Sequence, residues 1–197
     1  MRSKETIILA IVVLLLFVGG CSGCRVRNAL VAAEEAVKSE WANVESAYQR
    51  RADLIPNLVR TVERAESFDR SLIESMQGVQ ERSGALRLTE ADLRDASRLA
   101  EYGVAQDEVG SSLHRLLDVS QASEELRSVE TFRDLQDQIE GSENRINVAR
   151  RDYNEAVEQY NSRVRRFPTN IVAAMTGFEP RPPFEADAGA EDPPRVE

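Results

Sequence analysis

Apolar residues recur at spacings of three and four from about residue 26 to residue 167, and no useful length of this stretch alternates as a strand would. This period places apolar side chains along one face of an α-helix. A strict seven-residue repeat runs through Phe132, Ile139, Ile146, Tyr153, Tyr160 and Phe167. A repeat of seven keeps one seam of a helix against a partner helix. The pattern therefore predicts an all-α fold in which these aromatic residues pack a seam rather than forming a ligand box.

Helix-breaking residues divide the first half of this stretch into two predicted helices. Pro56 removes an intrahelical hydrogen bond and restricts the residue before it, so the first helix is expected to end there. Asp53 is expected to cap the second helix, with Pro56 in its first turn. The pair Ser83-Gly84 is expected to end the second helix.

Two more helices are predicted in the second half. Thr89 to Asp92 combines a capping hydroxyl with acids that favour the positive end of a helix dipole, and this third helix is expected to reach about Gln121. Ser123 or Ser128 is expected to cap a fourth helix that ends before Pro168. Four long helices with short turns most simply form an antiparallel up-and-down four-helix bundle, and a kinked, extended hairpin is the alternative.

The chain is expected to have three parts. Residues 1–24 form a hydrophobic leader or membrane anchor, residues 25–184 form the helical bundle, and residues 185–197 form an acidic tail that is expected to be disordered. Residues 167–178 are too apolar to be free in water, so this segment is expected to pack on the bundle.

The leader has the features of a membrane-targeting segment. Arg2 and Lys4 precede twelve consecutive apolar residues at 7–18, a length typical of a signal-peptide core and short for a spanning helix. The run Val-Gly-Gly-Cys ending at Cys21 resembles a bacterial lipobox, and Cys24 offers a second lipidation site. An uncleaved single span is the alternative. Both interpretations attach the protein to a membrane of the bacterial cell envelope.

Composition narrows the chemistry of the main body. The formal charge of −9 argues against a nucleic-acid partner, which would require a basic stripe to neutralise phosphate. His114 is the one histidine, and both cysteines lie in the leader, so a metal site has few ligands to draw on. The Glu-x-x-His pairs of a di-iron bundle are missing, since Ser111 stands three residues before His114. We therefore expect no metal, no cofactor and no catalytic residues.

Three long, ungapped runs resemble the LemA family of bacterial proteins. They are residues 50–59 preceded by Trp41, residues 143–157 continuing through Tyr160-Asn161, and residues 167–172 with Gly177-Phe178 and Phe184 beyond. The resemblance covers roughly residues 26–185. It implies a single N-terminal anchor or lipidated leader and a helical bundle whose molecular activity is not established. It also implies a membrane-protein partner, because family members often accompany other membrane proteins.

A polar cluster at Arg50, Arg51, Asp53 and Asn57 is a candidate interaction surface. The arginines could grip a carboxylate or phosphate with two parallel hydrogen bonds. In the alternative, favoured interpretation one arginine and Asp53 satisfy backbone groups around Pro56.

A second polar set is a candidate network between helices. It consists of Glu143, Arg150, Asp152 and Asn154, and the first two stand next to positions of the seven-residue repeat. A buried pair of this kind would fix helix register more than it would add stability. A solvated face and a ligand site are the alternatives.

Two functions fit these observations. The first is a non-enzymatic, membrane-anchored interaction or scaffold module that presents a helical bundle to a membrane or envelope protein. The second is a small-molecule-binding or enzymatic bundle with a pocket near Pro56, since helical bundles house ligands between their helices.

Overall fold

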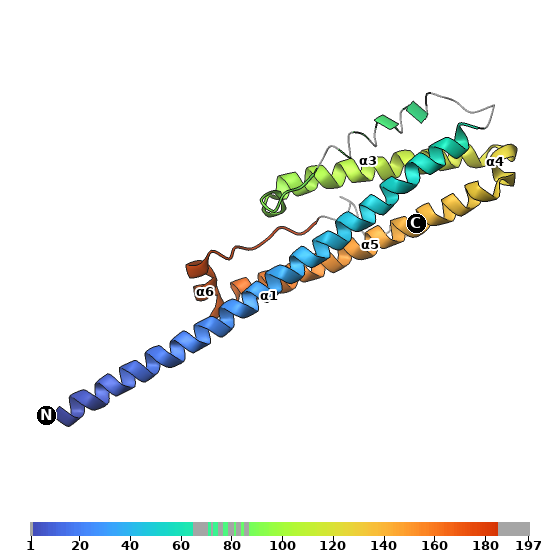
Figure 1. Cartoon of the computed structure of the whole chain (residues 1–197). Helices are drawn as coiled ribbons and strands as arrows, with labels where there is room; N and C mark the ends of the chain where they lie inside the picture. Colours follow the sequence, from blue (N-terminus) through green and yellow to red (C-terminus); the bar gives the residue numbers. More distant parts are fainter. Residues whose placement is uncertain are drawn as a thin grey trace, which may run out of the picture. The chain divides into compact units, whose positions relative to one another are not determined.

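The computed structural model describes the helix backbone over residues 2–22 and describes residues 23–64 and 87–184 in full, together with positions 71, 73, 74, 77, 78, 81 and 84. The helices are α1 (Arg2–Val62), η1 (Asp92–Arg94), α3 (Ala96–Gln121), α4 (Glu124–Ser128), α5 (Glu130–Arg165) and α6 (Thr169–Thr176) (Figure 1). No strand occurs among these residues. The all-α fold class is therefore confirmed, and the long helices α1, α3 and α5 fit a helical bundle.

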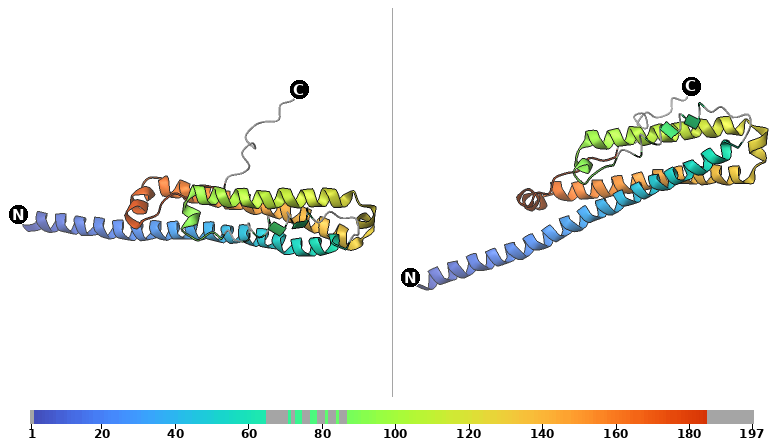
Figure 2. Two further views of the ribbon diagram at one scale, coloured as in Figure 1. Left: turned by 90° about the horizontal axis from the view of Figure 1, so that it is seen from above. Right: turned by 45° about the horizontal axis from the view of Figure 1, so that its top comes forward.

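The chain forms two compact units. Unit 1 combines residues 1–39 with 156–180, and unit 2 combines residues 40–155 with 181–197. In unit 2, α3 and the first part of α5 run in opposite directions and are joined through α4 (Figures 1 and 2). The predicted second helix ends at Ser83-Gly84, and most of that region, like the acidic tail and the side chains of residues 1–22, lies outside the described residues.

The seven-residue repeat forms the seam that its spacing predicts. Phe132, Ile139, Ile146 and Tyr153 are all buried in unit 2, and Tyr160 is buried in unit 1. The series fails at Phe167, which is exposed because α5 ends two residues earlier. The seam stops where the helix stops.

A group of aromatic rings fills the core of unit 2. The Trp41 ring lies 5.4 Å from the ring of Tyr153, 5.8 Å from that of Tyr102 and 5.9 Å from that of Phe184. The Tyr48 ring meets that of Tyr102 edge-on at 5.7 Å. Tilted and edge-on pairs of this kind contribute about 0.5–1.5 kcal/mol each beyond the area they bury. The cluster joins α1, α3, α5 and the segment after α6.

The prediction that Pro56 ends the first helix is wrong. α1 continues through Pro56 to Val62. A proline inside a helix costs about 3 kcal/mol, but Ile55 and Leu58 on either side are fully buried. Burying such side chains contributes roughly 1.5–3 kcal/mol each, which offsets that cost. Asp53 caps no helix, because it lies inside α1, where its carboxylate accepts a hydrogen bond from Gln49 Nε2 at 2.8 Å.

The start of the third helix also differs from the prediction. The Asp92 carboxylate accepts hydrogen bonds from the Thr89 backbone N–H at 2.8 Å and from its hydroxyl at 2.7 Å, but this motif begins only the short η1. Asp95 is extended and caps α3 by accepting from the backbone N–H of Ser97 at 2.9 Å. The break lets Leu93 turn into the core. The predicted end of this helix at Gln121 is confirmed.

The predicted fourth helix is two helices. The Ser123 hydroxyl caps α4 by accepting from the backbone N–H of Leu126. Val129 is extended and separates α4 from α5. Leu126 is buried and Val129 packs against the core. The bend therefore lets both apolar side chains face inward, and α5 ends before Pro168 as predicted.

The prediction that residues 167–178 pack on the bundle holds for little of the segment. In α6 the buried side chain is Ala173, whereas Phe167, Ile171 and Met175 are exposed. Since α6 is a short helix of eight residues, burying the face around Ala173 leaves the opposite face outward.

The buried tyrosines of unit 2 predict a loss of stability at alkaline pH. Burial raises the pKa of Tyr102 to about 12 and that of Tyr153 to about 12, and it also raises the pKa of Tyr48. Unfolded tyrosine ionises near pH 10, so above that pH the unfolded state loses protons that the folded state keeps. The free energy of unfolding should therefore fall from about pH 10 to about pH 12, by roughly 2–3 kcal/mol per tyrosine. Urea titrations across this range measure the slope.

Tyr153→Phe is the matched control. Among the described residues the Tyr153 hydroxyl has no hydrogen-bond partner, so this variant should keep near-normal stability at neutral pH and show a shallower alkaline slope. An unchanged slope would contradict the assignment.

Candidate functional site

The polar centre of unit 2 is the guanidinium of Arg51 on α1, whose side chain is 3% exposed. Its Nη2 donates to the backbone oxygen of Gln106 at 2.7 Å and to Gln106 Oε1 at 2.9 Å. Its Nη1 donates to Glu143 Oε1 at 3.1 Å. The guanidinium carbon also lies 5.2 Å from the centre of the Tyr48 ring. We call Arg51, Gln106 and Glu143 the buried arginine network, and it links α1, α3 and α5.

A glycine on α3 makes room for this network. A Cβ added at Gly110 would stand 3.2 Å from Arg51 Nη1 and 3.9 Å from Glu143 Oε1. Glycine inside a helix costs about 1 kcal/mol relative to alanine. This cost is offset because the close approach allows the guanidinium to reach α5.

A second ion pair joins α3 and α5 in the same unit. Arg150 Nη1 lies 3.1 Å from Asp107 Oδ1, and the guanidinium carbon lies 4.6 Å from the centre of the Phe184 ring. Asn154 accepts a hydrogen bond from the Phe184 backbone N–H and donates one to the Phe184 backbone oxygen, both at 2.8 Å. The side chains of Arg150 and Asn154 on α5 therefore hold the segment around Phe184 in place.

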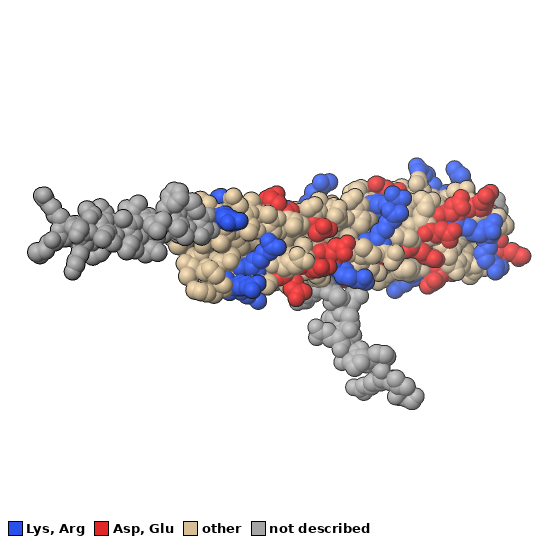
Figure 3. Space-filling view, turned by 90° about the horizontal axis from the view of Figure 1, so that it is seen from below, with Lys and Arg blue, Asp and Glu red and all other residues tan. Residues whose placement is uncertain are grey.

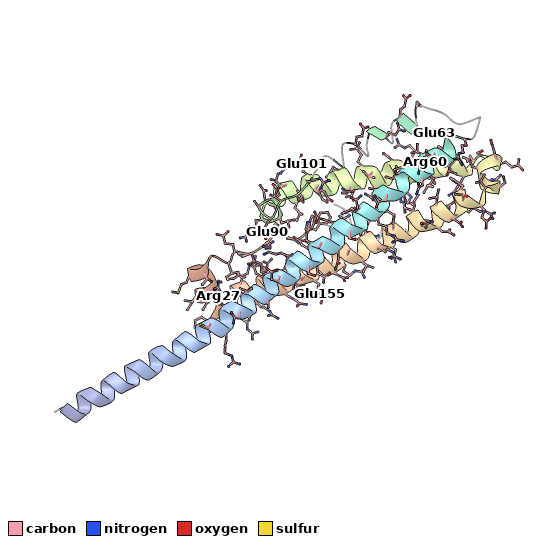
Figure 4. The ribbon with its side chains drawn as sticks, in the orientation of Figure 1. Arg27, Arg60, Glu63, Glu90, Glu101 and Glu155 are labelled. Carbon is pink, nitrogen blue, oxygen red and sulfur yellow. The ribbon has the colours of Figure 1, made fainter. Side chains whose placement is uncertain are left out.

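Arg181 completes this attachment. It is almost fully buried and donates to the carboxylate of Glu90, which is labelled in Figure 4. We call residues 181–184 the C-terminal strap. It is held by Glu90, Arg150 and Asn154.

The structure separates the residues of the first predicted cluster. Arg51 turns inward, whereas Arg50, Asp53 and Asn57 are exposed on α1. Asp53 accepts from Gln49, and Asn57 Oδ1 accepts from Arg60 (labelled in Figure 4). The four residues therefore do not form one anion-binding group.

The structure places the second predicted set and the cysteines as follows. Glu143, Arg150 and Asn154 contact other segments of unit 2, while Asp152 is exposed. Cys24 is an exposed free cysteine, and the side chain of Cys21 lies outside the described residues.

Sequence reasoning missed Gln106, Gly110 and Asp107 on α3. The sequence could nevertheless have indicated that Arg51 and Gln106 are buried. Arg51 stands three residues after Tyr48 and four before Ile55, within the apolar stripe of α1, and Gln106 stands between Tyr102 and Val109 in the stripe of α3. A charged or amide residue in phase with a buried stripe must find a partner inside.

A hollow of about 440 Å³ lies beside this network, near Pro56. Tyr48, Arg51 and Gln106 line it, together with Arg87 and Tyr102. The Tyr48 hydroxyl is buried, has no hydrogen-bond partner among the described residues, and stays neutral because burial raises its pKa. Glu45 and Asp53 line it as well, so the hollow presents charges of both signs to a small polar molecule.

The described residues offer neither a metal site nor a membrane span. No group of His, Cys, Asp and Glu side chains among them is arranged to hold a metal ion. No helix for which side chains are described, from residue 23 onward, has the length and apolar character needed to cross a bilayer.

The buried arginine network predicts a large loss of stability for Arg51→Ala and almost none for the same change at its neighbour Arg50. Arg51→Ala leaves the half-buried Glu143 without its cation and removes the partner of the buried Gln106, so it should lower the free energy of unfolding by about 3 kcal/mol. Arg50→Ala removes an exposed side chain and should change stability by less than about 0.5 kcal/mol. Chemical denaturation of both variants measures the difference, and equal stabilities would contradict the network.

Comparison with known proteins identifies the family. Two similar proteins are the magnetosome proteins MamQ 1 and MamQ 2 of Paramagnetospirillum magneticum (strain ATCC 700264 / AMB-1), each 26% identical over 182 residues. Each alignment covers 84% of this chain and 67% of the relative. The sequence profile of the LemA family matches residues 40–197. Because this match spans most of the chain, including the buried arginine network and the C-terminal strap, the protein belongs to the LemA family.

Proposed function

We propose that this protein is a membrane-anchored, non-enzymatic interaction module of the bacterial cell envelope that binds a membrane or envelope protein. The leader attaches the chain to the membrane, and the helices present a recognition surface. Membership of the LemA family supports the module as a whole. The exposed side of α1 in unit 2 supports the choice of surface.

The anchor is the leader of residues 1–24. Its twelve apolar residues at 7–18 suit either a signal peptide cleaved before a lipidated Cys21 or Cys24, or a short span of the membrane. In both cases the residues that follow Cys24 leave the membrane at its surface. The helices that follow are therefore held close to the membrane in both cases.

The single observation that carries the binding role is the orientation of the first polar cluster. Arg50, Asp53 and Asn57 recur at intervals of three and four residues on α1, so they share one helix face, and all three are exposed. Arg60 extends the same face. Arg51, the neighbour of Arg50, is instead used inside the protein. We call Arg50, Asp53, Asn57 and Arg60 the α1 polar face, and we assign it to the protein partner.

The non-enzymatic role is supported by the use of charged side chains as contacts between helices. Arg51 pairs with Glu143, and Arg150 pairs with Asp107 across helices. Such pairs fix the register of neighbouring helices. A rigid presenting surface needs that property.

Photo-crosslinking tests the partner surface. Benzoylphenylalanine placed at Arg50 should give a discrete protein adduct in native membranes after illumination, because that side chain points outward on the α1 polar face. The same probe at the exposed Asn147 of α5 is the matched control and should give no such adduct. Mass spectrometry identifies the partner. Failure of the Arg50 probe to give a discrete adduct, or the same adduct from both positions, would exclude this surface.

The hollow near Pro56 favours a second candidate, a module that binds a small polar ligand. The charged lining, with Arg87 beside Glu45 and Asp53, is the specific observation behind it. A ligand at one hundred times its dissociation constant would stabilise the fold by about 2.7 kcal/mol.

A thermal-shift screen separates the two candidates. Under the preferred proposal, small carboxylates, phosphates and divalent metal ions should leave the melting temperature of the detergent-solubilised chain unchanged. A rise of several degrees with one compound, lost in Arg87→Ala, would instead support the ligand-binding function.

A further inference from the structure

Unit 1 exposes an apolar face on its last helix. Phe167, Ile171 and Met175 stand four residues apart and are 76%, 52% and 81% exposed. Ile171 and Met175 share one side of α6, and the buried Ala173 lies on the other. Phe167 lies two residues before α6 begins. We call these three residues the α6 apolar face. Exposed large apolar side chains grouped in one short segment are typical of a contact with a protein or a membrane.

Five exposed basic side chains belong to the same unit, and two of them, Arg163 and Arg166, line one hollow with Phe167. Arg163, Arg165 and Arg166 precede the α6 apolar face at the end of α5, and Arg25 and Arg27 lie on α1, all five exposed. Neither residues 23–33 nor residues 159–178 contain an acid, although the chain as a whole carries a charge of −9. Figure 3 shows tan and blue atoms, without red, at the left end of the coloured surface on the face that it draws. The local charge therefore suits an anionic partner.

The α6 apolar face is held next to the leader. A hollow in unit 1 is lined by Val26, Ala29 and Leu30 of α1 and by Arg166, Phe167 and Thr169, so the start of α6 lies against α1 just after Cys24. Arg27 is labelled on this part of α1 in Figure 4.

The distance along α1 places this contact at the membrane surface. At a rise of 1.5 Å per residue, Val26 is about 3 Å and Leu30 about 9 Å beyond Cys24. The headgroup layer of one leaflet is about 5–8 Å thick. Cys24 leaves the membrane at this layer whether the leader is lipidated or spans. Residues 26–30, and the start of α6 beside them, then lie at headgroup depth.

We propose that the α6 apolar face docks into the headgroup region of the anionic membrane that holds the leader. This inference rests on the anchoring part of the proposed function. Exposed apolar side chains close in sequence to arginines, in the same unit as the leader, suit the boundary between acyl chains and anionic headgroups. The three apolar side chains enter the boundary between headgroups and acyl chains, and the five arginines contact lipid phosphates. Docking gives the protein a second attachment and fixes the orientation of unit 1 at the surface.

Fluorescence quenching by brominated lipids tests this proposal with the full chain. Met175→Trp places a reporter on the α6 apolar face. Ala36→Trp, also exposed and about 18 Å beyond Cys24 along α1, is the matched control. The natural Trp41 is buried and gives the same background in both. The vesicles contain brominated phosphatidylcholine with or without phosphatidylglycerol, and flotation first separates vesicle-bound protein.

The expected result is quenching at position 175, stronger with phosphatidylglycerol, and none at position 36. The double variant Arg165→Gln/Arg166→Gln should lower the ratio of docked to undocked α6 by about thirtyfold, because each arginine near an anionic surface contributes roughly fivefold. Both substituted side chains are exposed, so the fold should survive, and circular dichroism checks this.

The outcomes separate the two proposals. Protein that floats with vesicles but shows no quenching at position 175, or equal quenching at positions 175 and 36, overturns the docking and leaves the anchor intact. Protein that does not float overturns the anchor, and the docking falls with it. A photo-crosslinker at Met175 that captures a protein in native membranes, and no lipid, would also overturn the docking.

Discussion

The burial of one positive charge governs the arrangement of unit 2. Arg51 has three hydrogen bonds to protein groups and the face of an aromatic ring around it. A buried guanidinium without such partners would cost several kcal/mol. To bind this guanidinium, α3 must place a carbonyl and an amide oxygen, and α5 a carboxylate, at the same level along α1. Gly110 must also leave room for these groups to approach. These requirements fix how the three helices slide relative to one another, which an apolar seam alone leaves weakly defined.

The aromatic cluster and the arginine network divide the work of stabilisation in unit 2. The rings of Trp41, Tyr102 and Tyr153 bury apolar surface. The stabilisation from this burial changes little when the side chains shift slightly. Hydrogen bonds to Arg51 and Arg150 are directional and tolerate little displacement. The combination gives a stiff support for the exposed side of α1. Because Arg50 and Arg51 are neighbours, one holds the helix in place while the other remains on the surface.

The sequence was most informative where a repeat was long. The seam of α5 followed from six positions at one spacing, and five of them are buried. Single residues were less reliable guides. Pro56 predicts a break from its local chemistry, but the burial of Ile55 and Leu58 outweighs it. Arg51 could have been placed inside from its phase with Tyr48 and Ile55, whereas its partners could not, since Glu143 and Gln106 are brought near it by the fold. The exposure of Phe167, Ile171 and Met175 was unpredictable for a related reason: apolar composition indicates that a segment avoids water, not what covers it.

The C-terminal strap has a consequence for how the protein is made. Phe184 closes the ring cluster around Trp41, so the core of unit 2 joins residues about 140 positions apart in a chain of 197. Synthesis runs from the N-terminus, and the leader emerges long before the last ring of this core exists. Contacts between such remote positions form slowly because the chain between them must first be ordered. A chain tethered by its first residues would thus complete its core at the membrane surface only after residue 184 has been synthesised. Until then it would depend on remaining unaggregated with its aromatic side chains uncovered.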